Sequence, residues 1–459
     1  MSRKTASIAL KAAISDGILG PPSLVYKPGG PQHAALFYDL NEFEAGLDRA
    51  KQAFGKDFLH AMAMKSNPVS AVLKIVLDKG HGVECASIGE VLHALDIGFP
   101  PERIVFDSPV KTIPELKFGL EKGIIININS YEELEVMTDI MKELSHTKSK
   151  AGLRLNPLIG AGDIQALSVC TQDSKFGVLL TESSKEDLIS WYVNRPWLTG
   201  VHVHIGSQSF GYDSLTQGVK CIVQFALEVN HRVGRNQIDV VDIGGGLKVN
   251  TEDDTAGVSF EKYAQDLREK VPELFPSHGV FKQVITEFGH AFNTKAGWLV
   301  SRVEYTKVPS DELRVALIHF GADILLRTCY CPDVKKYQRR VEVFDSHGQP
   351  KEGKKINHNI AGPLCFSGDV IKRNILLPKV ERNDYIVLHD CGANSLSLFS
   401  RHCSRQAPAV FGYRVQESGK VTFETLKEAE TIDDLLTFWK GRNSRNTDEF
   451  KADALKNDL

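Results

Sequence analysis

Lys65 is the residue of this sequence whose type and position could support covalent chemistry. It follows the mostly apolar run 60–64, and Asn67-Pro68 breaks the pattern directly after it, as at the end of a buried strand. Such a lysine could simply extend its amine to solvent, which is the commoner case. It could also be a desolvated amine that forms a Schiff base with a carbonyl cofactor. Groups at the ends of other strands decide between the two.

Gly244, Gly245 and Gly246 close a later apolar run, directly after Asp242-Ile243. Glycines let a backbone approach an anion closely and point several N–H groups at it. A tight turn that needs positive φ would explain them equally well. Phosphate sites recur after the last two strands of parallel barrels, and this position favours phosphate.

His202 and His204 alternate with valines, which places both side chains on one face of a strand. A metal site in a barrel would need further His and Asp ligands at other strand ends, and we predict no metal. We expect His204 to stack on a ring and Ser207 to bind phosphate. His202 is more simply a core histidine.

Glu287 ends the last apolar run of the series. A carboxylate buried there needs a cationic partner, and a protonated pyridine nitrogen would serve. Together these residues predict pyridoxal 5′-phosphate as a cofactor. The lysine would bind its aldehyde, the glycines and the serine its phosphate, the histidine its ring face and the glutamate its ring nitrogen.

Short apolar runs that alternate with helical patterns must position these groups. Strands are expected near 60–64, 82–86, 103–107, 123–128, 151–156, 200–205, 238–243 and 283–287. Eight strand–helix units over about 250 residues are what a parallel (β/α)8 barrel requires. Polar residues such as Lys65, Glu84, His204 and Glu287 end these runs, where barrel enzymes place their chemistry.

After residue 297 the pattern changes to short alternating segments separated by Asp, Gly, Pro and Asn, which predicts an antiparallel β domain. The expected fold class is therefore α/β, a barrel joined to a β domain. We expect residues 1–39 to contribute to the β domain, 40–297 to form the barrel, 298–430 to complete the β domain, and 431–459 to form a helix and a mobile tail.

The composition is that of an ordinary globular chain of 459 residues, 42% hydrophobic and 25% charged. A net charge of −3 argues against a nucleic-acid or membrane-surface partner. No run is long enough to span a membrane. Eight cysteines without a regular framework indicate reduced thiols and a cytoplasmic location.

In order and spacing these residues resemble the fold-type III pyridoxal-phosphate decarboxylases, the family of ornithine, diaminopimelate and arginine decarboxylases, over most of the chain. This architecture, a barrel with a β domain, is also that of alanine racemase. The resemblance rests on Ala63-Met-Lys65-Ser-Asn67, Glu84-Cys-Ala-Ser-Ile-Gly-Glu90, Arg154-Leu-Asn-Pro157, Ser174-Lys-Phe-Gly177, His204-Ile-Gly-Ser-Gln208, Asp242-Ile-Gly-Gly-Gly246, Thr286-Glu287 and Gly362-Pro-Leu-Cys365.

The resemblance implies that Lys65 forms the Schiff base, that His204 stacks on the ring and that Glu287 pairs with its nitrogen. It implies a homodimer with shared active sites, in which Cys365 of the neighbouring subunit helps to protonate the intermediate. The cofactor-binding residues would be Lys65, Glu84, His204, Ser207, Gly244, Gly245, Gly246, Glu287, Gly289, His290 and Asn394.

The sequence departs from the family pattern at three places. The family's Glu-Pro-Gly-Arg is Glu287-Phe-Gly-His290, the acidic residue after the cysteine is Phe366, and the tyrosine expected after Gly-Ala is Asn394. In diamine-producing relatives that acidic residue holds the distal ammonium of the substrate, which phenylalanine cannot do. The substrate is therefore expected not to be a standard diamino acid.

Two further residues are candidates for substrate contacts, besides Phe366. Arg327 matches an arginine that contacts a substrate carboxylate in the diaminopimelate branch, although it could be a surface residue with its stem packed on the barrel. Asp369 could replace some of the lost acidity.

The function expected is decarboxylation of an amino acid, with Lys65, Cys365 and His204 as the catalytic residues. A fold-type III racemase is an alternative, but it would need a tyrosine base, and the Gly-Pro-x-Cys motif speaks against it. A non-catalytic regulatory homologue of ornithine decarboxylase is the third, which His290 and Asn394 keep open.

Overall fold

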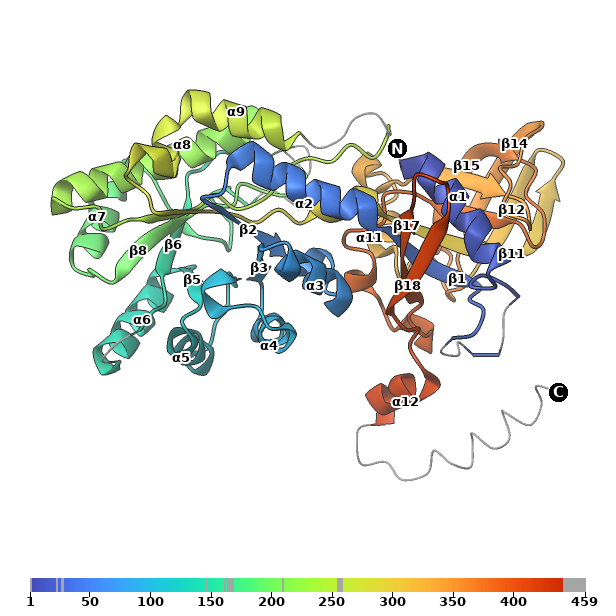
Figure 1. Ribbon diagram of the computed structural model, residues 1–459, viewed down its shortest axis with the longest axis horizontal. Coiled ribbons are helices and arrows are strands. Elements are labelled where there is room, and N and C mark those ends of the chain that lie inside the picture. Colours follow the sequence, from blue (N-terminus) through green and yellow to red (C-terminus); the bar gives the residue numbers. More distant parts are fainter. Residues whose placement is uncertain are drawn as a thin grey trace. The chain divides into compact units, whose positions relative to one another are not determined.

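The chain folds into two compact units in a computed structural model (Figure 1) that describes residues 2–21, 24–25, 29–144, 147–160, 162, 169–208, 210–253 and 259–440. The barrel unit comprises Leu40–Ala296 and Gly392–Ser397. The sheet unit comprises Met1–Asp39, Gly297–Cys391 and Leu398–Leu459.

The barrel unit is a closed ring of eight parallel strands, as the spacing of the apolar runs predicts. Its strands pair in the order β5-β4-β3-β2-β10-β9-β8-β6, and β6 pairs with β5 to close the ring. A short strand, β7 (Val178–Leu179), pairs with β6 outside the ring. The eight strands are β2 (Phe58–Ala63), β3 (Gly82–Cys85), β4 (Ile104–Phe106), β5 (Ile125–Ile128), β6 (Ala151–Asn156), β8 (Leu198–His202), β9 (Val240–Asp242) and β10 (Gln283–Thr286).

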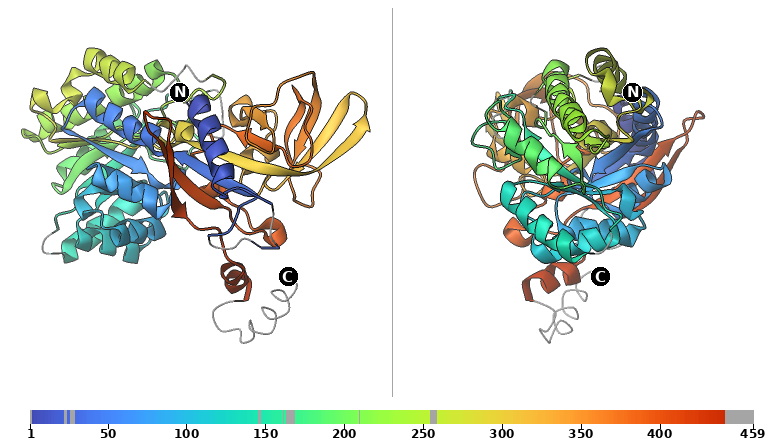
Figure 2. Two further views of the ribbon diagram at one scale, coloured as in Figure 1. Left: turned by 45° about the vertical axis from the view of Figure 1, so that its right-hand side comes forward. Right: turned by 90° about the vertical axis from the view of Figure 1, so that its left-hand side faces the viewer.

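Helices lie outside this ring of strands, as the two views of Figure 2 show. Hydroxyl groups of Ser87, Thr112, Ser130 and Ser259 accept backbone N–H bonds at four of the helix starts. The helices of the unit are α2 (Leu40–Phe54), α3 (Ser70–Asp78), α4 (Ile88–Ile97), α5 (Ile113–Lys122), α6 (Tyr131–Glu143), α7 (Lys185–Val193), α8 (Tyr212–Val233), α9 (Phe260–Lys270) and α10 (His290–Asn293).

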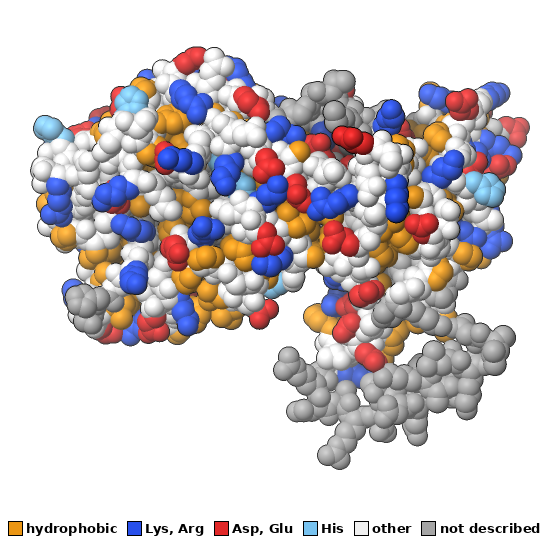
Figure 3. All heavy atoms as spheres, in the orientation of Figure 1, with side chains coloured by type: hydrophobic (Ala, Val, Ile, Leu, Met, Phe, Trp, Pro, Cys, Tyr) orange, Lys and Arg blue, Asp and Glu red, His pale blue; other side chains and the backbone are white. Residues whose placement is uncertain are grey.

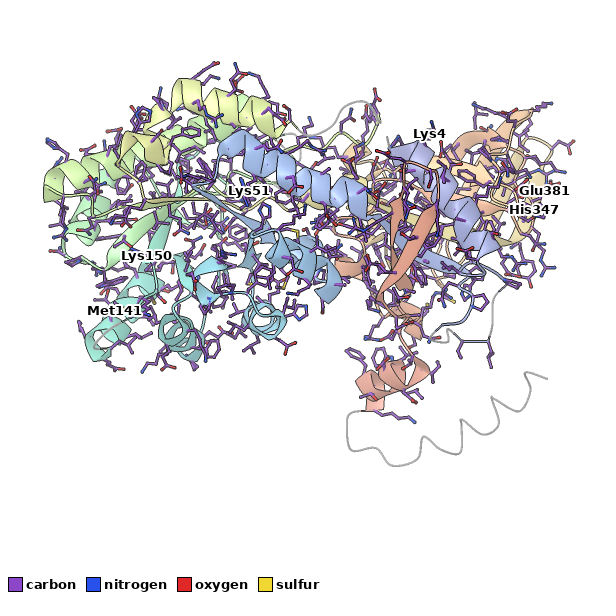
Figure 4. The ribbon with its side chains drawn as sticks, viewed as in Figure 1. Lys4, Lys51, Met141, Lys150, His347 and Glu381 are labelled. Atoms are coloured by element: carbon purple, nitrogen blue, oxygen red, sulfur yellow. The ribbon has the colours of Figure 1, made fainter. Side chains whose placement is uncertain are left out.

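The two ends of the barrel strands differ in their chemistry. Apolar side chains fill the ring near the amino ends, among them Ala61, Val105, Ile125, Val240 and Ile285. Asp239 forms ion pairs at those amino ends with Lys150 (3.6 Å) and Lys282 (2.9 Å). Lys150 is labelled in Figure 4. The polar residues predicted to end the apolar runs, among them Lys65 and Glu287, lie at the opposite, carboxyl ends.

The sheet unit contains one nine-stranded, mostly antiparallel sheet. Seven strands pair in the order β15-β14-β12-β11-β1-β17-β18, and β16 joins β13 to β11. The pairs β1–β17 and β12–β14 are parallel. The strands are β1 (Ala34–Asp39), β11 (Gly297–Ser310), β12 (Leu313–Ile318), β13 (Val341–Phe344), β14 (Lys355–Ala361), β15 (Val370–Pro378), β16 (Tyr385–Leu388), β17 (Ala409–Val415) and β18 (Val421–Lys427).

The core of the sheet unit joins distant parts of the chain. The helix α1 (Ser2–Ser15) packs Leu10 and three alanines against the aromatic residues of the sheet. There the rings of Phe37 and Trp298 stack at 4.5 Å between centroids. The short helices α11 (Leu326–Tyr330) and α12 (Ile432–Lys440) complete the unit. The tail predicted up to residue 459 lies outside the described residues after Lys440.

Charges of both signs mix on the face of the molecule that is shown in Figure 3. In Figure 3, basic and acidic side chains are interspersed over the face of each unit. Among the described residues, none of the helices combines the length and the apolar character needed to cross a membrane.

Candidate active site

The carboxyl ends of the barrel strands bring Lys65 next to a buried carboxylate. Lys65 lies in the turn Met64–Ser66 directly after β2, and its Nζ donates a hydrogen bond to Oε2 of Glu84 on β3. Glu84 is fully buried, whereas 55% of the Lys65 side chain is exposed at the open end of the barrel. The two residues are therefore an ion pair formed between adjacent strands.

The pairing changes the expected state of the lysine. The surrounding barrel atoms act to lower the pKa of Lys65, but the carboxylates of Glu84 and Glu287 outweigh them, and the pKa is raised. Burial raises the pKa of Glu84, while Lys65 opposes that rise. The amine is thus held in its charged form, and Glu84 is the group placed to take its proton.

A network of buried charges, which the sequence did not reveal, lies beside this pair. Asp107 directly follows β4, and Arg154 on β6 donates a hydrogen bond of 2.8 Å to its carboxylate. The imidazole of His202 lies between two carboxylates, 3.5 Å from Asp107 and 3.3 Å from Asp242. Asn127 donates to the same Asp242 oxygen at 2.9 Å. His202 is therefore part of an ionic network rather than an isolated core histidine.

Two of these groups have pKa values shifted in opposite directions. Burial disfavours the charged His202, but Asp242, Glu287 and Asp107 raise its pKa well above the usual value. Burial also disfavours the charged Asp107, but Arg154 and His202 hold its pKa well below the usual range. An imidazolium and a carboxylate thus stabilise each other inside the barrel.

The donor atoms of Asp107, His202 and Glu287 lie within 4.8 Å of one another, a grouping that could hold a metal ion. Arg154 already places a positive charge on Asp107. A second cation there would be repelled, so we interpret the grouping as buried ion pairs.

Glu287 directly follows β10 and is only 5% exposed. Among the described residues, its Oε1 atom has no hydrogen-bond partner. Burial raises its pKa well above the usual value and Asp242 adds to the rise, whereas His202 opposes it. A buried carboxylate with an unused acceptor calls for a donor, as the N–H of a protonated pyridine ring would be.

The three glycines form a cradle against neighbouring backbone. Gly244 has a φ of +65°, and a Cβ there would lie 2.5 Å from the carbonyl oxygen of Val203. A Cβ on Gly245 would collide with the carbonyl oxygen of Glu287. The N–H of Gly245 donates to Nδ1 of His204 at 3.0 Å. Only glycine lets this loop pack so closely on the chain that follows β8 and β10.

His204 is held as a neutral ring. Burial lowers its pKa well below the usual value, and the charges of Arg154 and Lys65 lower it further. Because Nδ1 accepts from Gly245, the ring proton lies on Nε2. A neutral, fixed imidazole suits stacking on an aromatic ring, which is the role that the sequence predicts for it.

Ser207 lies in a loop tied to the glycine loop. The side chain of Gln208 donates to the carbonyl of Leu247 at 3.0 Å and accepts from the N–H of Val249 at 3.0 Å. A Cβ on Gly246 would collide with the carbonyl of Gly206. The loop after β8 and the loop after β9 therefore form one surface, to which Ser207 and the glycines contribute.

Two departures from the family pattern contact each other. The amide of Asn394 donates to Nε2 of His290 at 2.6 Å, and Nδ1 of His290 lies 3.1 Å from the hydroxyl of Thr294. The backbone N–H of Asn394 donates to the carbonyl of Ser66, next to Lys65. Gly289 packs closely on Ser66, with its Cβ position 3.0 Å from that side chain. The histidine and asparagine thus form one hydrogen-bonded pair.

The remaining candidates lie in the sheet unit. Cys365 is exposed, and the ring of Phe366 stacks on Tyr330 at 5.2 Å. The guanidinium of Arg327 lies 5.8 Å above the ring of Tyr337, and among the described residues it forms no ion pair. The structure thus packs Arg327 on a tyrosine of its own unit.

Asp369 has a structural role in the same unit. It is only 3% exposed, and its carboxylate accepts backbone N–H bonds from Ala322 (2.7 Å) and Leu364 (2.6 Å). Its oxygens hold the loop that carries Cys365. The suggestion that Asp369 supplies the lost acidity toward a substrate is not supported by this arrangement.

The residues at the carboxyl end of the barrel fit pyridoxal phosphate. An amine, an unpaired buried carboxylate oxygen, a neutral imidazole and a glycine cradle come from β2, β10, β8 and β9 respectively. Each belongs to a different strand end, so the closed barrel positions all four.

The charged state of His202 has a consequence for stability. His202→Gln should lower the free energy of unfolding more at about pH 6 than at about pH 9. The pKa of His202 is higher in the folded than in the unfolded protein, so its charged form stabilises the fold fully below the unfolded pKa. This stabilisation is lost as the pH rises through the folded pKa. Urea unfolding of wild type and variant at both pH values measures the difference.

His81→Gln is the matched control, since His81 is equally buried but burial lowers its pKa to about 4. It stays neutral in the folded state at both pH values, and only its unfolded form takes up a proton near pH 6, so His81→Gln should cost no more stability at pH 6 than at pH 9. An effect of His202→Gln that is equal at the two pH values would contradict the charged state.

Comparison with known proteins agrees with this geometry. A family model described as the pyridoxal-binding domain of pyridoxal-dependent decarboxylases matches residues 40–294. The diaminopimelate decarboxylase of Helicobacter pylori strain J99 is 27% identical over 403 residues, which cover 87% of this chain and 93% of that protein. The diaminopimelate decarboxylase of Methanothermobacter thermautotrophicus is 28% identical over 383 residues, which cover 83% of this chain and 84% of that protein.

Solved structures show the same fold. A crystal structure of a mutant of the Helicobacter pylori diaminopimelate decarboxylase, complexed with L-lysine, has a TM-score of 0.77 and 25% identity. It covers 89% of this chain and 97% of that chain. The match to the family model extends over more than half of the sequence and includes every strand of the barrel. The chain therefore belongs to the pyridoxal-dependent decarboxylases, carboxy-lyases that act on amino acids with pyridoxal phosphate as cofactor.

Proposed function

We propose that the carboxyl end of the barrel is the decarboxylation site and that the substrate is an amino acid with a second carboxylate. The decarboxylation site is inferred from the ion pair of Lys65 with Glu84. It lies beside Glu287, whose Oε1 atom has no hydrogen-bond partner among the described residues. When bound, pyridoxal phosphate accepts the electrons that the departing carboxylate leaves behind.

The roles of the barrel residues follow from their contacts. Lys65 would hold the cofactor at its aldehyde, and Glu84, whose pKa is raised by burial, would take the proton of the amine. Glu287 holds the ring nitrogen, and the neutral His204 supports the ring face. Ser207 and the glycine cradle bind the phosphate through hydrogen-bond donors, while His290 and Asn394 brace the backbone next to Lys65.

The substrate proposal rests on Arg327 and Phe366. Among the described residues Arg327 has no carboxylate partner, so its guanidinium is available to a distal carboxylate of the substrate. Phe366 stacks on Tyr330 and offers no carboxylate to pair with a distal ammonium. The named relatives act on diaminopimelate, which carries such a carboxylate. We infer that the distal amino group contributes little to recognition in this chain.

We further propose a homodimer in which the loop of Cys365 serves the barrel of the other copy. There the thiol donates the proton that replaces the lost carboxylate. This arrangement, implied by the family resemblance, gives a reason for an exposed cysteine on a loop that Asp369 holds in place.

A panel of amino acids tests the substrate. Carbon dioxide release should be found with 2-aminopimelate and diaminopimelate at similar kcat/KM, and with lysine, ornithine and arginine it should be lower by a factor on the order of 100. Lys65→Ala should abolish release. A standard basic amino acid as the best substrate would contradict the proposal, as would racemisation without release.

The role of Arg327 has a matched control. Arg327→Met keeps the stem packed on Tyr337 and should raise KM for a dicarboxylic substrate by roughly tenfold or more. Arg382→Met should leave the KM for that substrate unchanged. Arg382 also lies above a tyrosine, but its guanidinium is already paired with Glu304.

The shared site is tested by mixing two inactive variants. Lys65→Ala and Cys365→Ala proteins, unfolded and refolded together, should regain about a quarter of the wild-type activity, because random pairing gives mixed dimers with one intact site. Each variant refolded alone is the control. A mixture as inactive as its components would exclude a shared site.

A further inference from the structure

All eight cysteines lie in the described part of the chain, and all are free thiols. Four are buried within the units: Cys85, Cys170, Cys329 and Cys391. Burial raises the pKa of each of these four thiols, which makes them poor nucleophiles. Cys221 is half-buried, and burial raises the pKa of its thiol as well. The other three, Cys331, Cys365 and Cys403, are exposed, and these are the thiols most open to modification.

Two of the residues that carry exposed thiols, Cys365 and Cys403, contact each other. The backbone N–H of Cys365 donates to the Sγ atom of Cys403 at 3.4 Å, across 38 residues of sequence. The neighbouring residues touch as well, since the rings of Phe366 and His402 meet edge to face at 6.3 Å. The loop that follows Gly362 and the turn at 402–404 therefore form a single surface within the sheet unit.

The turn presents Cys403 in an unusual backbone conformation. Cys403 has a φ of +60° and Ser404 a φ of +50°, both in the left-handed region that non-glycine residues seldom adopt. Such residues persist where their surroundings over-determine them. Here the conformation directs the sulfur of Cys403 toward the backbone of Cys365. Rotation about the Cα–Cβ bond of Cys365 moves its own sulfur among staggered positions, two of which lie beside that same N–H.

We propose that Cys365 and Cys403 are an oxidisable thiol pair that closes to an intramolecular disulfide when the protein meets hydrogen peroxide. In the first step the sulfur of Cys365 attacks one peroxide oxygen, the O–O bond breaks, and a sulfenic acid and one water form. In the second step the sulfur of Cys403 attacks the sulfenic sulfur, the S–S bond forms, and a second water leaves. The two sulfurs lose two electrons, which reduce one peroxide to two waters.

The closure would switch off catalysis. This consequence, unlike the disulfide itself, rests on the proposed function of Cys365 as proton donor, because a disulfide has no thiol proton to give. In the same step Cys403 protects Cys365 from irreversible oxidation, because a sulfenic acid that is captured as a disulfide is not oxidised further to a sulfinic acid. A thiol reductant restores both sulfurs.

Peptide mapping under non-reducing conditions tests the pair directly. The cofactor-loaded protein is treated with hydrogen peroxide, and the crosslinked peptide of Cys365 and Cys403 is sought by mass spectrometry. Decarboxylation should fall by a factor on the order of 100 as the crosslink appears, and dithiothreitol should reverse both changes.

Two variants sharpen the test. Cys403→Ser should keep the basal activity but lose the crosslink, and dithiothreitol should then fail to restore activity because Cys365 is overoxidised. Cys331→Ser is the matched control, an exposed thiol of the same unit, and should behave as wild type.

Three results would overturn the pair: a crosslink from Cys365 to Cys331, a crosslink between two chains on a non-reducing gel, or no crosslink in the wild type. A crosslink between Cys365 and Cys403 that leaves decarboxylation intact would support the pair and contradict the proposed role of Cys365.

Discussion

The burial of several carboxylates at one end of the barrel is the constraint on which the site depends. Glu84, Asp107, Asp242 and Glu287 are each at most 7% exposed. Isolated buried carboxylates are costly, so each requires a cation or a hydrogen-bond donor. Lys65 and Arg154 each donate to one oxygen of Glu84 and Asp107, and His202 lies beside Asp242. Oε1 of Glu84, Oδ1 of Asp107 and Oε1 of Glu287 have no hydrogen-bond partner among the described residues. We propose that a protonated cofactor ring supplies the donor that Glu287 lacks.

The barrel makes that arrangement possible because its parallel strands end at one rim. Lys65, His202, Asp242 and Glu287 belong to β2, β8, β9 and β10, or directly follow them, although they are far apart in the sequence. Apolar side chains fill the other end of the ring, so the charged groups sit on a rigid base. The sheet unit supplies a different kind of element, a loop held by Asp369 that exposes Cys365.

Much of this could be predicted because strand periodicity and residue type are local properties. Apolar runs gave all eight barrel strands, and the polar residues after them pointed to Lys65 and Glu287. The Arg154–Asp107 pair and the position of His202 between two carboxylates were missed, since such contacts join strands distant in sequence. The His290–Asn394 pair and the buried carboxylate of Asp369 were likewise invisible, because a sequence shows which groups are present but not which are already paired.

The central claim is that Lys65 is the lysine that binds the cofactor. Borohydride reduction of the protein loaded with pyridoxal phosphate fixes the cofactor to its lysine, and mass spectrometry of the peptides then locates it. We expect a pyridoxyl group on Lys65 of the wild-type chain, a lower yield of it in Glu287→Gln, which removes the carboxylate that holds the ring, and none at position 65 in Lys65→Ala. A pyridoxyl group on another lysine of the wild-type chain would contradict it.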